Sequence, residues 1–172
     1  LPALDPAIEA LHFGSYSIAV SPVAETLAAL AERERDRCIS LDPNVRLNVE
    51  PSVAVWRERI ARLLPVATLV KVSSEDLALL EPGRDPVAVA RSWLAAGPAL
   101  VVVTRGGEGA IALRASETLS VPAVAASVVD TVGAGDTFQA ALLDGLRQER
   151  ALSRAGIERM AAGRLEAILK RA

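Results

Sequence analysis

Short apolar stretches alternate along the chain with longer stretches of helical periodicity, and this alternation constrains the fold most. We expect strands over residues 8–13, 37–41, 67–72 and 99–104, and helices over residues 21–35, 52–64, 73–80 and 86–96. Strands separated by helices of this length need crossover connections, which build a mainly parallel sheet. Two more strands, at 110–114 and 118–121, follow a glycine turn and should add an antiparallel edge. The alternation predicts a Rossmann-like, three-layer α/β/α domain, mainly parallel with antiparallel edge strands.

Several helix ends carry signals of their own. Ser21 is expected to cap the first helix, with Pro22 in its first turn. Gly97 closes the helix that ends at residue 96, because glycine readily ends a helix. The tail, residues 153–172, is expected to form one or two further helices.

Composition narrows the class of protein. The 172 residues suit one domain, and a hydrophobic content of 51 % supplies a core. Basic and acidic residues are mixed, with a net charge of −2, so we expect neither a nucleic-acid partner nor a membrane surface. No apolar run approaches the length of about 18 residues that a membrane helix needs. The single cysteine, Cys38, lies in an apolar run; we expect it in the core and the protein in the reducing cytoplasm.

Polar clusters follow the predicted strands. They comprise residues 14–15, 42–44, 73–76, 104–109 and 130–136. In a doubly wound sheet, ligands bind beyond the carboxyl ends of the strands. Because every cluster follows a strand, we expect a shared ligand-binding edge.

The segment from Asp130 to Phe138 carries the strongest functional signal. An extended run over residues 121–129 ends in a turn with two glycines, Gly133 and Gly135, and then a helix begins. Residues 138, 141, 142, 145 and 146 mark one face of that helix. Free N–H groups and the helix dipole make such a turn suitable for anions, phosphate above all. Asp136, next to the turn, is either a general base for an attacking hydroxyl or a favourable acid at a helix N-terminus.

The sequence Asp-Thr-Val-Gly-Ala-Gly-Asp at 130–136 resembles the signature of the ribokinase-like, or PfkB, carbohydrate kinases. The resemblance extends over nearly all of the chain and is greatest to the fructokinases. It implies an ATP-dependent sugar kinase that transfers the γ-phosphate to a sugar hydroxyl. Asp136 would be the catalytic base, and the amides of Gly133, Ala134 and Gly135 would stabilise the transferring phosphoryl group. Thr131 would contact the nucleotide.

Two more blocks match the family's patterns. Thr104, Gly106 and Gly109 match a turn that contacts nucleotide phosphate and ribose, although a glycine-rich hairpin turn would look the same. Residues 71–76 resemble a block that places Mg²⁺ and phosphates. There Lys71 and Ser73 would bind the cofactor and Asp76 would hold Mg²⁺ through water; a capped helix start is the alternative.

Family members are longer, so the resemblance implies that residues 1–172 are a nucleotide-binding α/β domain from the C-terminal part of a longer sugar kinase. The N-terminal sugar-binding and lid part and the final helices would be absent, and the chain alone should not phosphorylate sugar. The resemblance also allows a monovalent cation such as K⁺ and a homodimer. Alternatives are a 2-keto-3-deoxygluconate, ribose or nucleoside kinase of the same family, or a non-catalytic nucleotide-binding relative.

A few polar or aromatic residues have simpler explanations. Residues 42–46 either steer phosphate through Arg46 or form a turn. His12, the only histidine, is expected to be a core or edge residue rather than a catalytic one. Trp56 and Trp93 lie within predicted helices and are expected to pack in the interior.

Overall fold

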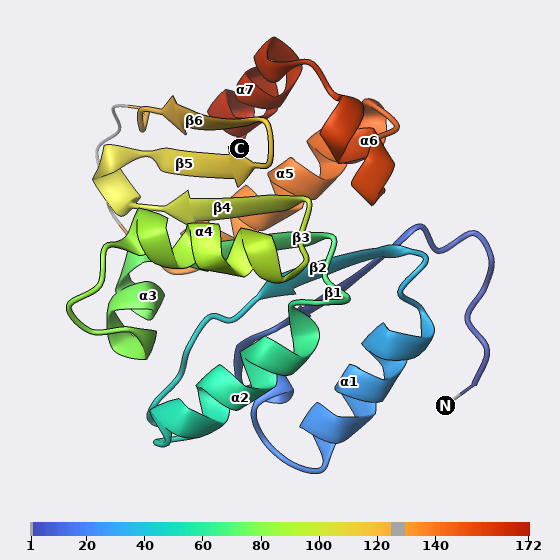
Figure 1. The fold of residues 1–172 in the computed structure, drawn as a ribbon, viewed down its shortest axis with the longest axis vertical. Helices are drawn as coiled ribbons and strands as arrows, with labels where there is room; N and C mark the ends of the chain where they lie inside the picture. The colour runs from blue at the N-terminus through green and yellow to red at the C-terminus, as the bar shows by residue number, and fades with distance from the viewer. Residues whose placement is uncertain (1, 125–129) are drawn as a thin grey trace.

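A six-stranded mixed sheet forms the centre of the computed structural model, which describes residues 2–124 and 130–172 (Figure 1). The strands lie in the order β1 to β6: Ala10–Gly14, Cys38–Asp42, Leu69–Ser73, Leu100–Thr104, Ala110–Arg114 and Glu117–Val121. The first four pair in parallel, and β5 and β6 add antiparallel pairs at one side. The predicted mainly parallel sheet with antiparallel edge strands is confirmed.

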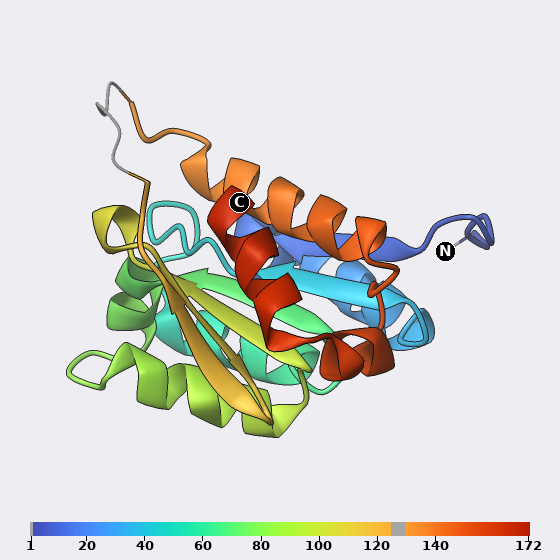
Figure 2. The same cartoon turned by 90° about the horizontal axis from the view of Figure 1, so that it is seen from above.

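Helices cover both faces of this sheet, so the predicted three layers are confirmed. One face carries α1 (Val23–Arg33), α2 (Val53–Leu63), α3 (Ser74–Leu80) and α4 (Pro86–Ala96). The other carries α5 (Ala134–Gln148), α6 (Arg154–Arg159) and α7 (Ala162–Arg171), as Figure 2 shows. Two short 3₁₀ helices, η1 (Ser15–Ile18) and η2 (Gly106–Glu108), follow β1 and β4.

The helical layers arise differently from those of a doubly wound sheet. The strand order follows the chain without reversal, and parallel crossovers are right-handed, so α1 to α4 all lie on one face. The second layer comes from the helices after β6. In the described residues the sheet therefore has no point where the strand order reverses. The candidate ligand position is therefore the start of α5, above the sheet edge, and not a point of strand reversal.

The core follows from the alternation of side chains along each strand. Val70, Val72, Val101 and Val103 pack in the core beneath α1 to α4. Their neighbours Leu69, Leu100 and Val102 pack against the other helical layer. The predicted face of α5 is confirmed there, because Leu142 and Leu146 are fully buried.

Several buried side chains confirm their predicted structural roles. Trp56 is fully buried and Trp93 packs against the same core. Cys38 is buried in β2, where desolvation raises the pKa of its thiol to about 11. All three residues therefore contribute to packing.

The predicted cap of the first helix is wrong. Helix α1 begins at Val23 with Pro22 at the N-cap position, where no side chain caps it. Ser21 lies one residue too early, and its hydroxyl instead donates to Glu25 Oε1 at 2.7 Å. Strand β6 ends at Val121, and residues 125–129 of the predicted extended run lie outside the described residues.

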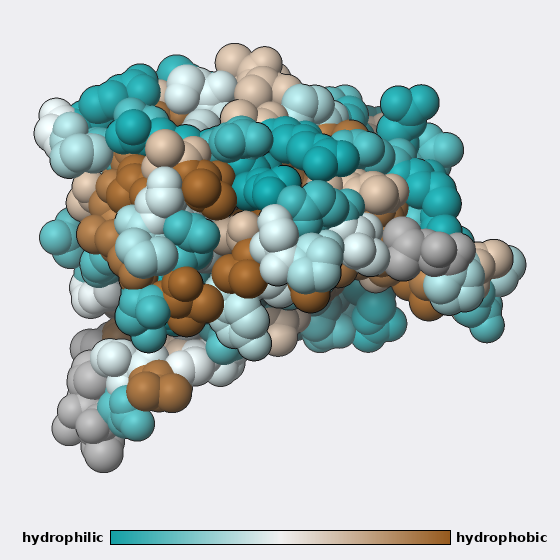
Figure 3. All heavy atoms as spheres, turned by 90° about the horizontal axis from the view of Figure 1, so that it is seen from below, coloured by the Kyte–Doolittle hydropathy of each residue, from teal (hydrophilic) through white to brown (hydrophobic). Residues whose placement is uncertain are grey.

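Among the described residues, no helix has the length and apolar character needed to cross a membrane. The face in Figure 3 shows hydrophobic residues in small groups set among hydrophilic ones. The large hydrophobic side chains that are exposed come from separate parts of the chain: Tyr16, Val23, Val49, Leu79, Val124 and Val132.

Candidate active site

The polar clusters after β1 to β4 lie along one edge of the sheet. Gly14 pairs with Asp42 at the ends of β1 and β2, and Ser73 pairs with Thr104 at the ends of β3 and β4. The start of α5 lies at the same end of the molecule as η2 (Figure 2). These clusters therefore share one edge, as expected, and ligand binding at that edge stays a prediction.

The glycine turn at the start of α5 has the form expected of an anion-binding turn. Gly133 occupies the left-handed region, with φ of 76°, and serves as the N-cap. The backbone N–H groups of Gly133, Gly135 and Asp136 have no hydrogen-bond partner among the described residues. The N–H of Ala134 differs, because it donates to the carbonyl oxygen of Thr131 at 3.1 Å. The helix start therefore offers free donors beside the exposed Asp136.

A buried ion pair lies beneath this turn. Lys71 Nζ donates to Asp42 Oδ2 at 2.7 Å, and the two side chains are only 5 % and 4 % exposed. The ammonium also lies against Gly135, where a Cβ atom would come within 2.8 Å of Nζ. The second oxygen of Asp42, Oδ1, is buried and has no partner among the described residues. Asp42 and Lys71 thus join β2, β3 and the first turn of α5.

A chain of polar side chains continues this cluster toward β1. Gln139 Nε2 donates to Ser40 Oγ at 2.7 Å, and Ser40 Oγ lies 3.0 Å from His12 Nδ1. Ser40 and Gln139 are buried, whereas His12 is exposed on the edge strand. Ser40 and Gln139 were not predicted from the sequence to be site residues. The signal for this cluster lies in β2, an apolar strand that carries polar residues at two alternate positions, Ser40 and Asp42. Alternate residues of a strand point to the same face.

His12 lies on the edge strand β1, which is one of the two positions, core or edge, that the sequence predicted. Partial desolvation lowers the pKa of its imidazole from the usual 6.5, and Lys71 lowers it further, while Asp42 and Asp136 act in the opposite direction. His12 therefore lies within electrostatic reach of the expected base, although no hydrogen bond joins it to Asp136 in the described residues.

The start of α3 has the capped geometry that was one of its two expected readings. Ser73 Oγ accepts a hydrogen bond from the N–H of Asp76 at 2.9 Å. Asp76 Oδ1 accepts from the N–H of Val45 at 3.0 Å, and burial raises the pKa of this carboxyl group. No group of three acidic, histidine or cysteine residues suited to a metal occurs in the described part of the chain. Asp76 thus offers one buried carboxylate, one oxygen of which already accepts the Val45 N–H.

The Thr104 to Gly109 segment connects β4 to β5 through η2. The N–H of Arg105 donates to the carbonyl oxygen of Gly109 at 2.8 Å, which closes the turn. Gly109 has φ of 88°, and a Cβ atom there would lie 2.1 Å from the carbonyl oxygen of Val121. Gly106 also has a positive φ, but nothing lies within 4 Å of its absent Cβ. The turn therefore requires glycine at 109 for its own structure, whereas a Cβ atom at 106 would meet no neighbouring atom.

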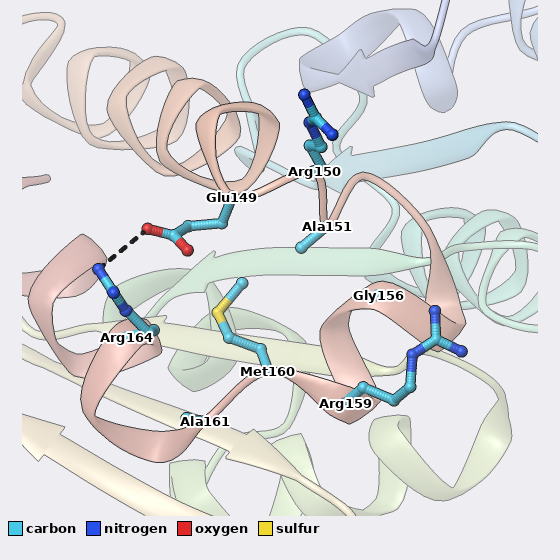
Figure 4. Close-up of a pocket in the computed structure, with 8 residues that line it drawn as sticks. All are labelled: Glu149, Arg150, Ala151, Gly156, Arg159, Met160, Ala161 and Arg164. Carbon is cyan, nitrogen blue, oxygen red and sulfur yellow. Dashed lines mark ion pairs between the residues drawn. The ribbon is translucent and has the colours of Figure 1, made fainter.

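A hollow of about 290 Å³ lies elsewhere, between the end of α5, α6 and α7 (Figure 4). Glu149 and Arg164 form an ion pair across it at 3.6 Å, and Met160 points into it. The hollow lies near the last turn of α5, away from Gly133, and it is separate from the candidate site.

The fold and this edge define a class of α/β protein that presents a glycine turn, suited to an anion, above the carboxyl ends of parallel strands. Residues 6–162 match the model of the pfkB family of carbohydrate kinases, and the chain belongs to that family.

The relatives agree with this assignment. The chain is 43 % identical over 155 residues to a fructokinase of Rhizobium leguminosarum bv. trifolii, covering 90 % of this chain and 48 % of the relative. Aminoimidazole riboside kinase of Salmonella enterica, solved with aminoimidazole riboside and an ATP analogue, superposes with a TM-score of 0.77 at 26 % identity; 94 % of this chain and 52 % of that one are covered. Fructokinase of Vibrio cholerae, solved with fructose, ADP and calcium, gives 0.74 at 25 % identity, with 95 % and 53 % covered. The chain thus spans about half the length of these relatives.

Proposed function

We propose that the chain is the nucleotide-binding domain of an ATP-dependent sugar kinase, and that fructose is the acceptor. Membership of the pfkB family and 43 % identity to a fructokinase support this proposal. The reaction would transfer the γ-phosphate of ATP to a sugar hydroxyl, with ADP as the second product.

The observation that carries the proposal is the position of Asp136 in the first turn of α5. Its carboxylate is exposed, directly after a turn whose N–H groups at Gly133 and Gly135 lack partners in the described residues. A sugar hydroxyl is a poor nucleophile, and a carboxylate within hydrogen-bond reach would accept its proton as it attacks. The free N–H groups would meanwhile stabilise the charge of the transferring phosphoryl group. The N–H of Ala134 would stabilise this charge only after breaking its hydrogen bond to the carbonyl oxygen of Thr131.

The nucleotide would lie along the same sheet edge. Thr104, Gly106 and Gly109 would line its phosphates and ribose, with Thr131 facing it from the segment just before α5. Ser73 and Asp76 fit a position that orients a hydrated cation, because Asp76 contributes one carboxylate and Ser73 a hydroxyl that already caps α3. Bound Mg²⁺ would neutralise charge on the phosphates.

A monovalent cation such as K⁺, a homodimer and a cytoplasmic location stay predictions from the sequence.

One finding favours a second acceptor class. A structural relative at 26 % identity was solved with aminoimidazole riboside, so a nucleoside-like acceptor fits the same fold. Fructose is favoured here because the fructokinase relative is more similar in sequence, at 43 % identity.

A coupled assay of ADP release by the whole protein tests the proposal. The acceptors would be fructose, ribose, 2-keto-3-deoxygluconate and adenosine, each with ATP and Mg²⁺. We expect fructose to give the highest kcat/KM. A higher kcat/KM with another acceptor would contradict the choice of fructose, and no stimulation by any acceptor would contradict the kinase assignment.

A further inference from the structure

We propose that Lys71 is a positioning residue that supports the glycine turn from beneath, through Gly135, rather than a ligand of the nucleotide. This inference rests on the proposed function. From the sequence, Lys71 was predicted to be a nucleotide-binding residue. The contacts of its ammonium group point to the different role.

Lys71 is turned into the protein. Its side chain is 5 % exposed, and Nζ donates to Asp42 Oδ2 at 2.7 Å. Burying such a pair costs desolvation free energy, and well-packed apolar residues are often as stable or more stable in its place. Fold stability alone therefore gives little reason for an ammonium ion at this place between the sheet and α5.

The two glycines of the turn are needed for different reasons. Gly133 has φ of 76° and open space where a Cβ would be, so its backbone conformation requires glycine. Gly135 lies within α5, outside the left-handed region, so its φ does not require glycine. A Cβ atom at Gly135 would instead come within 2.8 Å of Lys71 Nζ. Glycine at 135 therefore lets the helix start rest on the ammonium group.

The contact cannot relax easily, although lysine is normally a flexible side chain. Asp42 holds the ammonium group from the β2 side, and both partners are buried. Lys71 also belongs to β3, where it pairs with Val102 of the central strand β4. The height of the turn above the sheet is therefore set by a lysine held at both its backbone and its tip.

This arrangement predicts a specific kinetic effect. If the turn shifts, the N–H groups of Gly133 and Gly135 are displaced from the transferring phosphoryl group, and a displacement of 1 Å can cost about 100-fold in rate. Loss of an interaction made only in the transition state lowers kcat without weakening substrate binding. Loss of a direct contact to bound nucleotide would instead raise the KM for ATP.

The first test removes both charges, because Lys71→Met alone would leave Asp42 buried and unpaired. In the whole protein, with the best acceptor, we expect the Lys71→Met/Asp42→Asn variant to lower kcat by about 100-fold. The KM for ATP should change by less than about threefold, since ground-state binding is retained. A rise in that KM of about tenfold or more, or an unchanged kcat, would overturn the inference.

The second test measures the contact itself by a double-mutant cycle. Gly135→Ala should lower kcat strongly in the wild-type background and much less in the Lys71→Met/Asp42→Asn background, because the clash with Nζ is gone. Gly163→Ala serves as the control, since no atom lies within 4 Å of its absent Cβ. Equal effects of Gly135→Ala in the two backgrounds would contradict the proposed contact.

A third measurement does not depend on turnover. Hydrogen exchange should become faster at the amides of residues 134–136 in the Lys71→Met/Asp42→Asn variant, with the middle of α2 unchanged. If the wild-type protein phosphorylates no acceptor, the proposed function fails while this test still stands. Unchanged exchange at 134–136 would overturn the positioning role, whatever the activity.

Discussion

The carboxylate of Asp76 accepts a hydrogen bond from the backbone N–H of Val45, with 3.0 Å between Oδ1 and N. The bond ties the first turn of α3 to the loop after β2. It gives Asp76 a structural role at the site, whether or not the residue also orients a cation. Because the acceptor atom is buried, the bond also links the protonation of Asp76 to the stability of the fold.

Replacement of Asp76 by Asn should change how stability depends on pH. Burial raises the pKa of Asp76 above its usual 3.8, so the folded protein retains this proton at a pH where the unfolded chain has lost it. Asp76 therefore makes the fold less stable as pH rises from 3.8 through its raised pKa. Asparagine keeps an acceptor for the Val45 N–H and has no charge. The free energy of unfolding of Asp76→Asn, relative to the wild type, should increase over this range and then level off.

Urea unfolding at a series of pH values measures this difference. The matched control is Asp144→Asn, because Asp144 is exposed on α5 and its pKa is lowered, chiefly by its hydrogen bond to Arg147. The free energy of unfolding of Asp144→Asn, relative to the wild type, should decrease as pH rises from acidic values. Parallel curves for Asp76→Asn and the wild type between pH 4 and 7 would refute the linkage.

The single histidine reports directly on the candidate site. Partial desolvation lowers the pKa of His12, so an NMR titration of its ring protons should give a midpoint below the usual 6.5. The folded state favours neutral His12, and the fold loses this contribution to stability as pH falls through 6.5 toward the lowered pKa. Asp136 acts to raise this pKa, so Asp136→Asn should lower the midpoint further. An identical midpoint in Asp136→Asn would mean that the two residues do not interact.

Gly109 should be the most sensitive position in the turn between β4 and β5. Gly109→Ala would force alanine to φ of 88° and place its Cβ 2.1 Å from the carbonyl oxygen of Val121. We expect a loss of about 3 kcal/mol or more in the free energy of unfolding, from strain and displacement together. Gly107→Ala has open space and no positive φ, and should stay within about 0.5 kcal/mol of wild type. Similar unfolding midpoints for the two variants would show that the turn tolerates a side chain at 109.

Cys38 should be almost unreactive in the folded protein. Desolvation raises the pKa of its thiol from 9.0 to about 11, so at pH 8 the thiolate is about 100-fold scarcer than for an ordinary thiol. Reaction with a disulfide reagent should be slower by at least that factor in the native protein than in denaturant. Rapid labelling of the native protein would mean that β2 opens readily.

Features carried by local patterns were predictable from the sequence. Alternation along β4 and spacing along α5 both follow from the periods of strand and helix. The turn at Gly133 is likewise a local signal, because a positive φ there follows from the glycine and the helix that begins next to it.

The contacts beneath the turn could not be predicted in this way. The bond between Gln139 and Ser40 joins residues 99 positions apart, and no pattern within one segment contains it. The contact of Lys71 with Gly135 likewise depends on where α5 lies over the sheet. That position is set by Leu142 and Leu146 in the core and by a strand order that never reverses.

Asp136→Asn tests directly whether Asp136 is the general base. It should be compared with Asp144→Asn, which removes an exposed carboxylate from the same helix, outside the candidate site. In the ADP-release assay on the whole protein, loss of a general base should lower kcat by about 100- to 10,000-fold with little change in the KM for ATP. Asp144→Asn should stay near the wild-type rate. Near-normal turnover by Asp136→Asn with the best acceptor would contradict the role of Asp136 as general base.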